Sequence, residues 1–314
     1  MAAERIQKVL ARAGYGSRRQ LETWIQEGKV TVNGEVASLG DQIKEGDTIK
    51  LDGKPCSPKR VWQQPQQVLL YHKPVGEVCT RNDPEGRRTI FQSLPAPEQG
   101  RWVSVGRLDL NTSGLIILTT DGELANQLMH PSSEMDREYA VRVLGEVTPE
   151  MMQQLRDGVM LEDGEAKFTD IQESGGEGAN HWYHVVIQEG RNREVRRLWE
   201  AIGVQVSRLM RLRYGPVIMP NKLKPGRWMA LEGKDLDNLY EEAGLKSQAA
   251  AVAQKTGRGA IKTSNPAEKT AKPASKWPSK KPVNSDEKPK RGGAKKARPE
   301  KFNPRKAPRI RGRD

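Results

Sequence analysis

Two segments of this sequence concentrate residue types that could carry out chemistry. The first is residues 106–115, which read Gly-Arg-Leu-Asp-Leu-Asn-Thr-Ser-Gly-Leu. This composition favours a tight loop between two strands, which could hold the carboxylate of Asp109 rigidly while it faces a cleft. An ionised carboxylate can serve as nucleophile or base if a nearby cation keeps it charged. By composition alone, the commoner role of such an aspartate is to accept hydrogen bonds in an Asx turn.

The second segment is residues 189–198, in which four arginines surround a predicted helix start. Free backbone amides at a helix N-terminus favour anions, and guanidinium groups add to that preference. The segment therefore predicts a phosphate-binding site. The alternative is an exposed basic helix end without a ligand.

The elements that must position these segments are predicted from hydrophobic periodicity and capping residues. Strands are expected at residues 68–72, 103–108, 115–118 and 139–143, and helices at 124–129, 150–156 behind a Thr148 cap, and 193–202 behind Asn192. No regular strand-helix repeat is present. This pattern predicts an α+β domain over residues 68–245, with a mixed, mostly antiparallel sheet and flanking helices.

Three further expectations concern structural residues in the same domain. Residues 119–122 have the composition of a hairpin turn. Three tryptophans are expected to pack in the core or between domains, namely Trp102, Trp199 and Trp228, the alternative being that they stack on RNA bases. The histidines His181 and His184 fall on opposite faces of a predicted strand, so we expect no metal site there.

Residues 1–60 predict a separate small domain. Ile6, Val9 and Leu10 mark one helix, and Ser17 caps a second. Asn33-Gly34 then predicts a β-hairpin between short strands. A linker is expected at residues 61–67, where glutamines flank Pro65.

The net charge of +13 is confined to the end of the chain. Of the 53 basic residues, 21 lie from Lys246 onward, against 5 of the 40 acidic residues, so this tail carries +16 and the preceding residues −3. Residues 246–314 are rich in Lys, Arg, Pro, Ala and Ser and predict a disordered tail. We expect the tail to contact phosphates non-specifically, the alternative being a solubilising tail.

Other classes of protein are disfavoured by what the sequence contains. Its two cysteines are not spaced as in a cysteine-pair motif and are too few for a disulfide framework. This favours a protein of a reducing compartment that holds no structural zinc. The longest apolar runs are far shorter than the roughly 18 residues that a membrane helix requires. A cytoplasmic protein is therefore expected, with no membrane partner.

The first of these domains resembles the S4 RNA-binding domain. The resemblance rests on residues 8–14, 17–19, 28–34 and 46–47. It implies that basic side chains of the helix pair and hairpin contact structured RNA, namely Arg12, Arg18, Arg19 and Lys29. The alternative is a solvated basic face.

The second domain resembles the pseudouridine synthases that modify ribosomal RNA of the small or the large ribosomal particle. Residues 106–115 match the signature of that group. Three other motifs occur in the group's order, namely Lys73-Pro74, Arg137-Glu138-Tyr139 and residues 190–198. Residues 79–87, 174–178 and 193–201 are most similar to the members that act on the large particle.

The resemblance implies conversion of a uridine in ribosomal RNA, of the large particle in this branch, to its C5-glycoside isomer without cofactor or metal. Asp109 would be the catalytic carboxylate and Arg196 the cation that keeps it ionised. Tyr139 would stack on the uracil and accept its C5 proton. Whether the carboxylate attacks the ribose, attacks the base or removes a ribose proton stays open.

The resemblance also implies a set of substrate-binding residues, namely Lys73, Arg107, Leu108, Thr112 and Arg193. A paired uridine must leave its helix to be reached, so the expected partner is a structured ribosomal RNA hairpin with an accessible uridine, bound by a monomer. Arg107 could fill the vacated stack, or it could instead form a structural ion pair.

A non-catalytic ribosome-assembly factor, working through the S4-like domain and the tail, is the alternative function. An RNA methyltransferase is disfavoured because no glycine-rich strand-turn-helix fingerprint is present.

Overall fold

The computed structural model describes residues 3–63 and 65–247. Its N-terminal module contains three helices, α1 (Ile6–Arg12), α2 (Arg18–Gln26) and α3 (Pro58–Trp62). Its strands are β1 (Glu4–Arg5), β2 (Val30–Val32), β3 (Glu35–Val36), β4 (Gln42–Ile43), β5 (Ile49–Leu51) and β6 (Lys54–Pro55). The Ser17 side chain accepts a hydrogen bond from the amide of Gln20, which confirms the predicted cap of α2.

The predicted hairpin is also present in this module, since Val32 pairs with Glu35 across Asn33-Gly34. The module is longer than the sequence predicted, because α3 occupies the first two positions of the expected linker. Val61 of α3 is 1% exposed and packs in the core of the N-terminal module. Ser57 caps this helix and Pro58 begins it, a combination that favours helix initiation.

The second domain is built on a nine-stranded mixed sheet, as predicted. The hydrogen-bonded order is β13-β14-β10-β15-β9-β7-β17, with β16 beside β15 and β8 beside β9. The strands are β7 (Val68–Lys73), β8 (Val103–Val105), β9 (Ser113–Thr119), β10 (Arg137–Leu144), β13 (Asp170–Glu177), β14 (Asn180–Ile187), β15 (Gln205–Tyr214), β16 (Val217–Ile218) and β17 (Trp228–Ala230). The pairing of β9 with β15 is parallel, whereas the other pairs are antiparallel.

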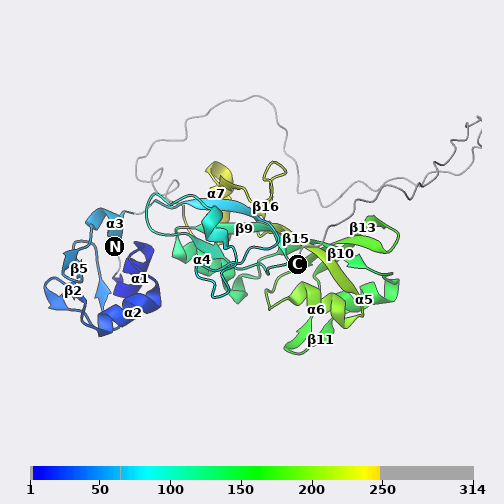
Figure 1. The fold of residues 1–314 in the computed structure, drawn as a ribbon, viewed down its shortest axis with the longest axis horizontal. Helices are drawn as coiled ribbons and strands as arrows, with labels where there is room; N and C mark the ends of the chain where they lie inside the picture. Colours follow the sequence, from blue (N-terminus) through cyan, green and yellow to red (C-terminus); the bar gives the residue numbers. More distant parts are fainter. Residues whose placement is uncertain (1–2, 64, 248–314) are drawn as a thin grey trace, which may run out of the picture. The chain divides into compact units, whose positions relative to one another are not determined.

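Both faces of this sheet are covered, so its central strands are apolar on both sides. In β9, Leu115 and Ile117 belong to one core, whereas Ile116 and Leu118 belong to the other. The helices are α4 (Gly122–Met129), α5 (Pro149–Asp157), α6 (Glu194–Ala201) and α7 (Gly233–Glu242). Figure 1 shows α5 and α6 at the β10 end of the sheet and α4 and α7 at the β9 end.

The remaining elements lie in the connections between strands. They are the hairpin of β11 (Val159–Leu161) and β12 (Gly164–Ala166) and two short 3₁₀ turns, Ile90–Ser93 and Pro131–Ser133.

The structure corrects three of the predictions from sequence. Asp121 caps α4 by accepting hydrogen bonds from two amides of its first turn, so residues 119–122 start a helix and are not a hairpin turn. The helix predicted behind Asn192 begins one residue later, after Arg193 in the left-handed region with φ 49°. Trp228 is 43% exposed, whereas Trp102 and Trp199 are buried as expected.

A close approach of two strands fixes the position of the sheet's only parallel pair in the described part of the chain. Gly114 at the start of β9 has φ +112°, and a Cβ atom there would lie 2.3 Å from the carbonyl oxygen of Arg211. Only a residue without a side chain permits this contact. The predicted disordered tail, residues 246–314, lies outside the described residues from position 248 onward.

Candidate active site

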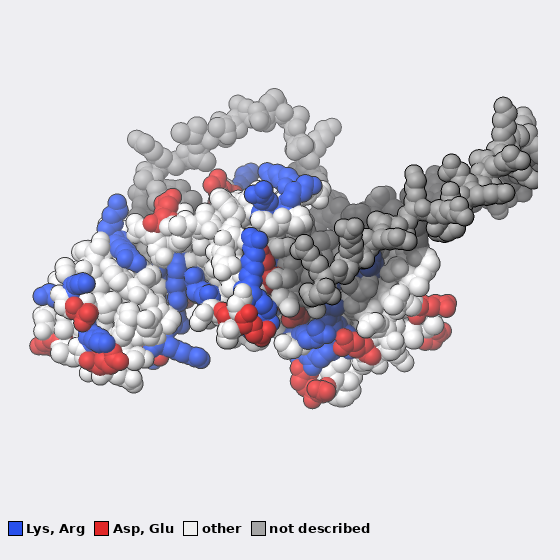
Figure 2. Space-filling view, in the orientation of Figure 1, with Lys and Arg blue, Asp and Glu red and all other residues white. Residues whose placement is uncertain are grey.

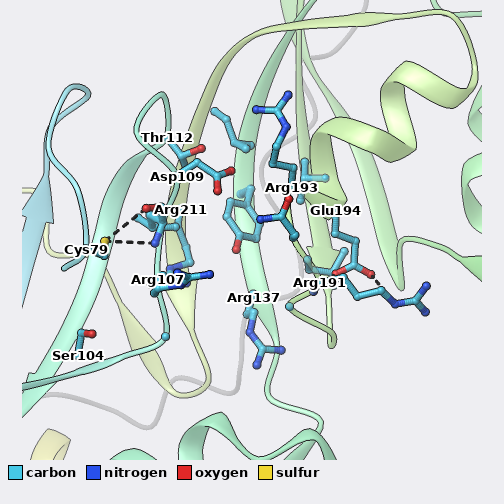
Figure 3. Close-up of a pocket in the computed structure, with 18 of the residues that line it drawn as sticks. Cys79, Ser104, Arg107, Asp109, Thr112, Arg137, Arg191, Arg193, Glu194 and Arg211 are labelled. Carbon is cyan, nitrogen blue, oxygen red and sulfur yellow. Dashed lines mark hydrogen bonds and ion pairs between the residues drawn. The ribbon is translucent and has the colours of Figure 1, made fainter. Parts of the chain in front are cut away.

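A cavity of about 1030 Å³ opens between the loop that joins β8 to β9 and the segment that leads into α6. Asp109 and Tyr139 both line it. Figure 3 shows Asp109 and Thr112 on one wall and Arg193 and Glu194 on the facing wall. The sheet therefore brings together residues from the two segments that the sequence singled out.

A buried lysine holds the loop that carries Asp109. The side chain of Lys73 is 0% exposed, and its ammonium donates to the backbone carbonyls of Pro74 (3.0 Å), Asp109 (3.0 Å) and Thr112 (2.8 Å). Burial lowers the pKa of Lys73, and the charges of Cys79, Glu77 and Asp109 oppose that shift. Lys73, which we expected to contact substrate, is not among the residues that line the cavity.

Backbone groups of the same loop are held at three further points. Leu108 donates its amide to the Cys79 sulfur and accepts from it, each at 3.4 Å. Gly76 donates to the carbonyl of Leu110 at 2.9 Å. Arg196 donates to the carbonyl of Asn111 at 2.9 Å. The loop is thus fixed through its main chain, which leaves the Asp109 carboxylate free of hydrogen bonds and ion pairs with other described residues.

Arg196 is placed differently from the prediction of an ion pair with Asp109. Its guanidinium is 7% exposed and binds the carbonyls of Asn111 and Val206, and no ion pair within 4.0 Å joins it to Asp109 in the described chain. Burial lowers the pKa of Arg196 and Arg193 lowers it further, whereas Asp109 raises it. Asp109 and Arg196 therefore interact at a distance, without a direct ion pair.

The other predicted substrate-binding residues line the cavity, namely Arg107, Leu108, Thr112 and Arg193. Arg107 is exposed and forms no ion pair with a described residue, which argues against the structural ion pair considered for it. The Thr112 hydroxyl is buried without a hydrogen-bond partner in the described chain. A buried polar group without a partner is costly.

Most of the predicted phosphate site at α6 is occupied by the protein's own groups. Arg197 forms a two-point ion pair with Asp163 at 2.8 and 2.9 Å, and Arg191 binds Glu189 at 2.5 Å. Arg193 pairs with Glu200 at 3.4 Å and remains 43% exposed in its side chain. Of these three arginines, Arg193 is therefore the one most accessible to an anion in the cavity.

Glu194, for which no role was predicted, also lines the cavity. It is 3% exposed and accepts a hydrogen bond from the amide of Arg191 at 3.0 Å. Burial raises the pKa of this carboxyl above its ordinary value of 4.5. The sequence signal that could have found it is an acid in the first turn of a helix.

We expect Glu194→Gln to become more stable relative to the wild type as pH rises above 4.5. Because folding raises the pKa of Glu194, the folded state retains a proton that the unfolded chain releases, so the wild type loses stability across that interval. Urea unfolding of both proteins from pH 4.5 to 8 measures the difference. A difference that stays constant would contradict the prediction, and Glu162→Gln, at an exposed position, is the control.

Two buried arginines, whose contacts the sequence did not predict, flank one tyrosine ring beside the cavity. The guanidinium carbons of Arg137 and Arg211 lie 5.2 and 5.0 Å from the ring centroid of Tyr214. Arg211 donates to the carbonyl of Leu115 at 2.8 Å, while its Nη2 is buried without a partner in the described chain. Arg211 lies next to the loop of Asp109 because β9 and β15 pair in parallel. No local sequence pattern predicts this pairing.

Of the four predicted RNA-binding residues in the N-terminal module, two form ion pairs within the protein and two do not. Arg12 pairs with Glu4 at 3.0 Å, and Lys29 pairs with Glu27 at 2.7 Å. Arg18 and Arg19 are exposed at the start of α2 and form no ion pair with a described residue.

Metal-binding and membrane-spanning features are both absent from the described residues. They contain no group of three His, Cys, Asp or Glu side chains that could hold a metal ion. His184 and His181 each lie beside a glutamate, Glu138 at 3.1 Å and Glu173 at 3.4 Å, which the sequence did not predict. No helix in these residues has both the length and the apolarity needed to span a membrane.

Comparison with protein families identifies both domains. The profile described as RNA pseudouridylate synthase matches residues 67–201, and that of the S4 domain matches residues 4–49. A solved structure described as "Crystal structure of pseudouridylate synthase" is 27% identical, covers 75% of this chain and 99% of its own, and superposes with a TM-score of 0.53.

Closer relatives carry the name ribosomal large subunit pseudouridine synthase B. The protein of Pseudomonas aeruginosa is 60% identical over 247 residues, which cover 78% of this chain and 64%, less than two thirds, of the relative. That of Yersinia pestis is 56% identical over 76% of both chains, and that of Vibrio cholerae is 54% identical over 80% of this chain and 78% of the relative.

Proposed function

This chain belongs to the RNA pseudouridylate synthase family, and from that membership we propose that it isomerises a uridine of large-subunit ribosomal RNA to pseudouridine. The bond from C1′ of the ribose to N1 of uracil breaks, and a bond from C1′ to C5 forms. The hydrogen at C5 leaves as a proton and N1 gains one, so no oxidant, reductant or cofactor is consumed.

The observation that carries the proposal is the state of the Asp109 carboxylate. It lines a cavity large enough for a nucleotide, on a loop fixed by main-chain bonds, and forms no hydrogen bond or ion pair with another described residue. Attack on the ribose, attack on the base and removal of a ribose proton all require such a rigid and unoccupied carboxylate. In this proposal Arg196 holds the loop of Asp109 through the carbonyl of Asn111, and Arg193 faces the substrate.

The proposed substrate is a structured hairpin whose uridine leaves the stack and enters the cavity. Extruding a base costs a few kcal/mol, and an aromatic face inside the pocket offsets the stacking that is lost. Tyr139, 7% exposed in the cavity wall, supplies this face, and the exposed Arg107 occupies the gap left in the RNA. Arg18 and Arg19 would bind RNA phosphates at the N-terminal module.

We propose that the enzyme acts as a monomer. Since its substrate would be ribosomal RNA, we place the reaction in the cytoplasm.

The proposal is tested by tritium release from large-subunit ribosomal RNA hairpins labelled at C5 of uridine. We expect the wild type to release tritium and to form one pseudouridine for each tritium released. Failure to release tritium from any hairpin of this RNA would contradict the proposal. Mapping pseudouridine in cells with and without the gene would then locate the target.

We expect Tyr139→Phe to lower kcat about a hundredfold or more while KM stays within about threefold. The substitution keeps the aromatic face that stacks on uracil and removes the oxygen that accepts the C5 proton. Single-turnover tritium release at saturating RNA measures the effect. Wild-type kcat in Tyr139→Phe would restrict this residue to stacking, and Tyr183→Phe, outside the cavity lining, is the control for loss of a hydroxyl.

A further inference from the structure

The segment between β16 and β17 exposes three cations and an indole on one short stretch of chain. Lys222, Lys224 and Arg227 are exposed, and Trp228 is 43% exposed. None of the four forms an ion pair or hydrogen bond through its side chain with another described residue. Figure 2 shows Lys and Arg side chains gathered over the region labelled β16 in Figure 1.

This segment is held firmly by main-chain contacts to His72 of β7. The His72 amide donates to the carbonyl of Arg227 at 3.0 Å, and its carbonyl accepts from Gly226 at 2.8 Å. Its ring Nδ1 donates to the carbonyl of Leu223 at 2.9 Å, and the side chain of Leu223 is only 5% exposed. The basic side chains therefore extend from a fixed backbone, so less conformational entropy is lost when they bind.

The same end of β7 also holds the loop of Asp109. The residue after His72 is Lys73, whose ammonium binds the carbonyl of Asp109, and Gly76 then donates to Leu110. Val75, between these contacts, is 59% exposed. The segment and the catalytic loop are thus tied to one turn of chain.

The chemistry of the segment fits unpaired RNA. A base can stack on an exposed indole whatever its identity, and neighbouring cations can neutralise phosphates of the same strand. None of these three cations forms an ion pair with a carboxylate of the described residues, so all three can bind phosphate groups. An isolated exposed tryptophan needs no ligand, but an indole next to an unpaired arginine and two unpaired lysines has the composition of a single-strand binding surface.

We propose that residues 222–228 form a second contact surface for the substrate RNA, which we call the β16–β17 surface. Trp228 stacks on an unpaired nucleotide that flanks the target uridine, and Lys222, Lys224 and Arg227 bind the adjoining phosphates. This inference rests on the proposed function, because its ligand is the RNA that the cavity processes.

The stacking contact is tested with Trp228→Ala and Trp228→Phe on a hairpin RNA that the wild type modifies. Trp228→Ala should raise Kd and KM roughly five- to a hundredfold and leave kcat at saturating RNA within twofold. Trp228→Phe should recover most of the affinity because it restores an aromatic face. Circular dichroism and thermal unfolding verify that both variants fold. Unchanged affinity in Trp228→Ala, or a loss in kcat alone, would overturn the proposal.

The phosphate contacts are tested with Lys224→Gln against Lys167→Gln, a change at an exposed position outside the surface. Lys224→Gln should flatten the slope of log Kd against log salt by about 0.7 to 0.9, as one lost phosphate contact requires. Equal slopes in the two variants would contradict the proposal. Tritium release by the wild type is measured on the same RNA. If the wild type releases tritium but the two salt slopes are equal, only the β16–β17 surface is refuted. If the wild type releases no tritium, the proposed function itself is refuted.

Discussion

Replacement of Asp109 by asparagine should lower kcat by about a thousandfold or more while RNA affinity stays within about threefold. The amide has nearly the same shape as the carboxylate, but it is neither a strong nucleophile nor a base. Because Lys73 holds this loop through carbonyl oxygens, the substitution leaves the anchoring contacts intact. Single-turnover tritium release and filter binding on the same RNA measure the two quantities.

The matched control is Asp170→Asn, at an exposed aspartate of β13 that does not line the cavity. This variant should keep wild-type kcat and KM. Full tritium release by Asp109→Asn would instead show that another group, and not this carboxylate, carries out the reaction. Equal losses of kcat in both variants would show that removal of a negative charge lowers activity wherever the charge lies.

Replacement of Gly114 by alanine should cost about 3–5 kcal/mol in the free energy of unfolding. The new methyl group would lie 2.3 Å from the carbonyl oxygen and 2.5 Å from the amide nitrogen of Arg211, so one strand must shift. The backbone also has φ +112°, which an L side chain adopts only with strain. Urea unfolding followed by tryptophan fluorescence measures the loss.

Gly145→Ala separates the steric clash from the backbone strain. Gly145 has φ +115°, and a Cβ atom there meets nothing within 4 Å. It should cost about 1–2 kcal/mol, the strain alone. Equal losses in the two variants would show that the close approach of β9 and β15 adds no steric cost at Gly114.

Local signals in the sequence predicted part of the catalytic domain, whereas β13, β15, β16, β17 and α7 were not predicted. Thr148 caps α5 through the amide of Met151, as its position before Pro149 predicted. The apolar run of residues 68–72 forms a strand that is buried on both faces. Such signals depend on a few neighbouring residues, so they do not require knowledge of the tertiary contacts.

The contacts that build the site depend on partners far apart in the chain. Lys73 was expected at the substrate from the family resemblance, yet its ammonium binds carbonyls 36 and 39 positions away in the chain. Arg196 was expected beside the Asp109 carboxylate, and it binds the backbone of the same loop instead. Trp228 was expected in the core because tryptophan is usually buried, but its strand lies at the edge of the sheet.

The anchoring of the catalytic loop through carbonyl oxygens has a consequence for diversity within such enzymes. Every amino acid has a backbone carbonyl. The side chains of Leu110 and Asn111 can therefore be replaced without losing the hydrogen bonds from Lys73 and Arg196. Substitutions at these two positions should therefore leave the acid beside them in place, and a library randomised there should yield folded proteins.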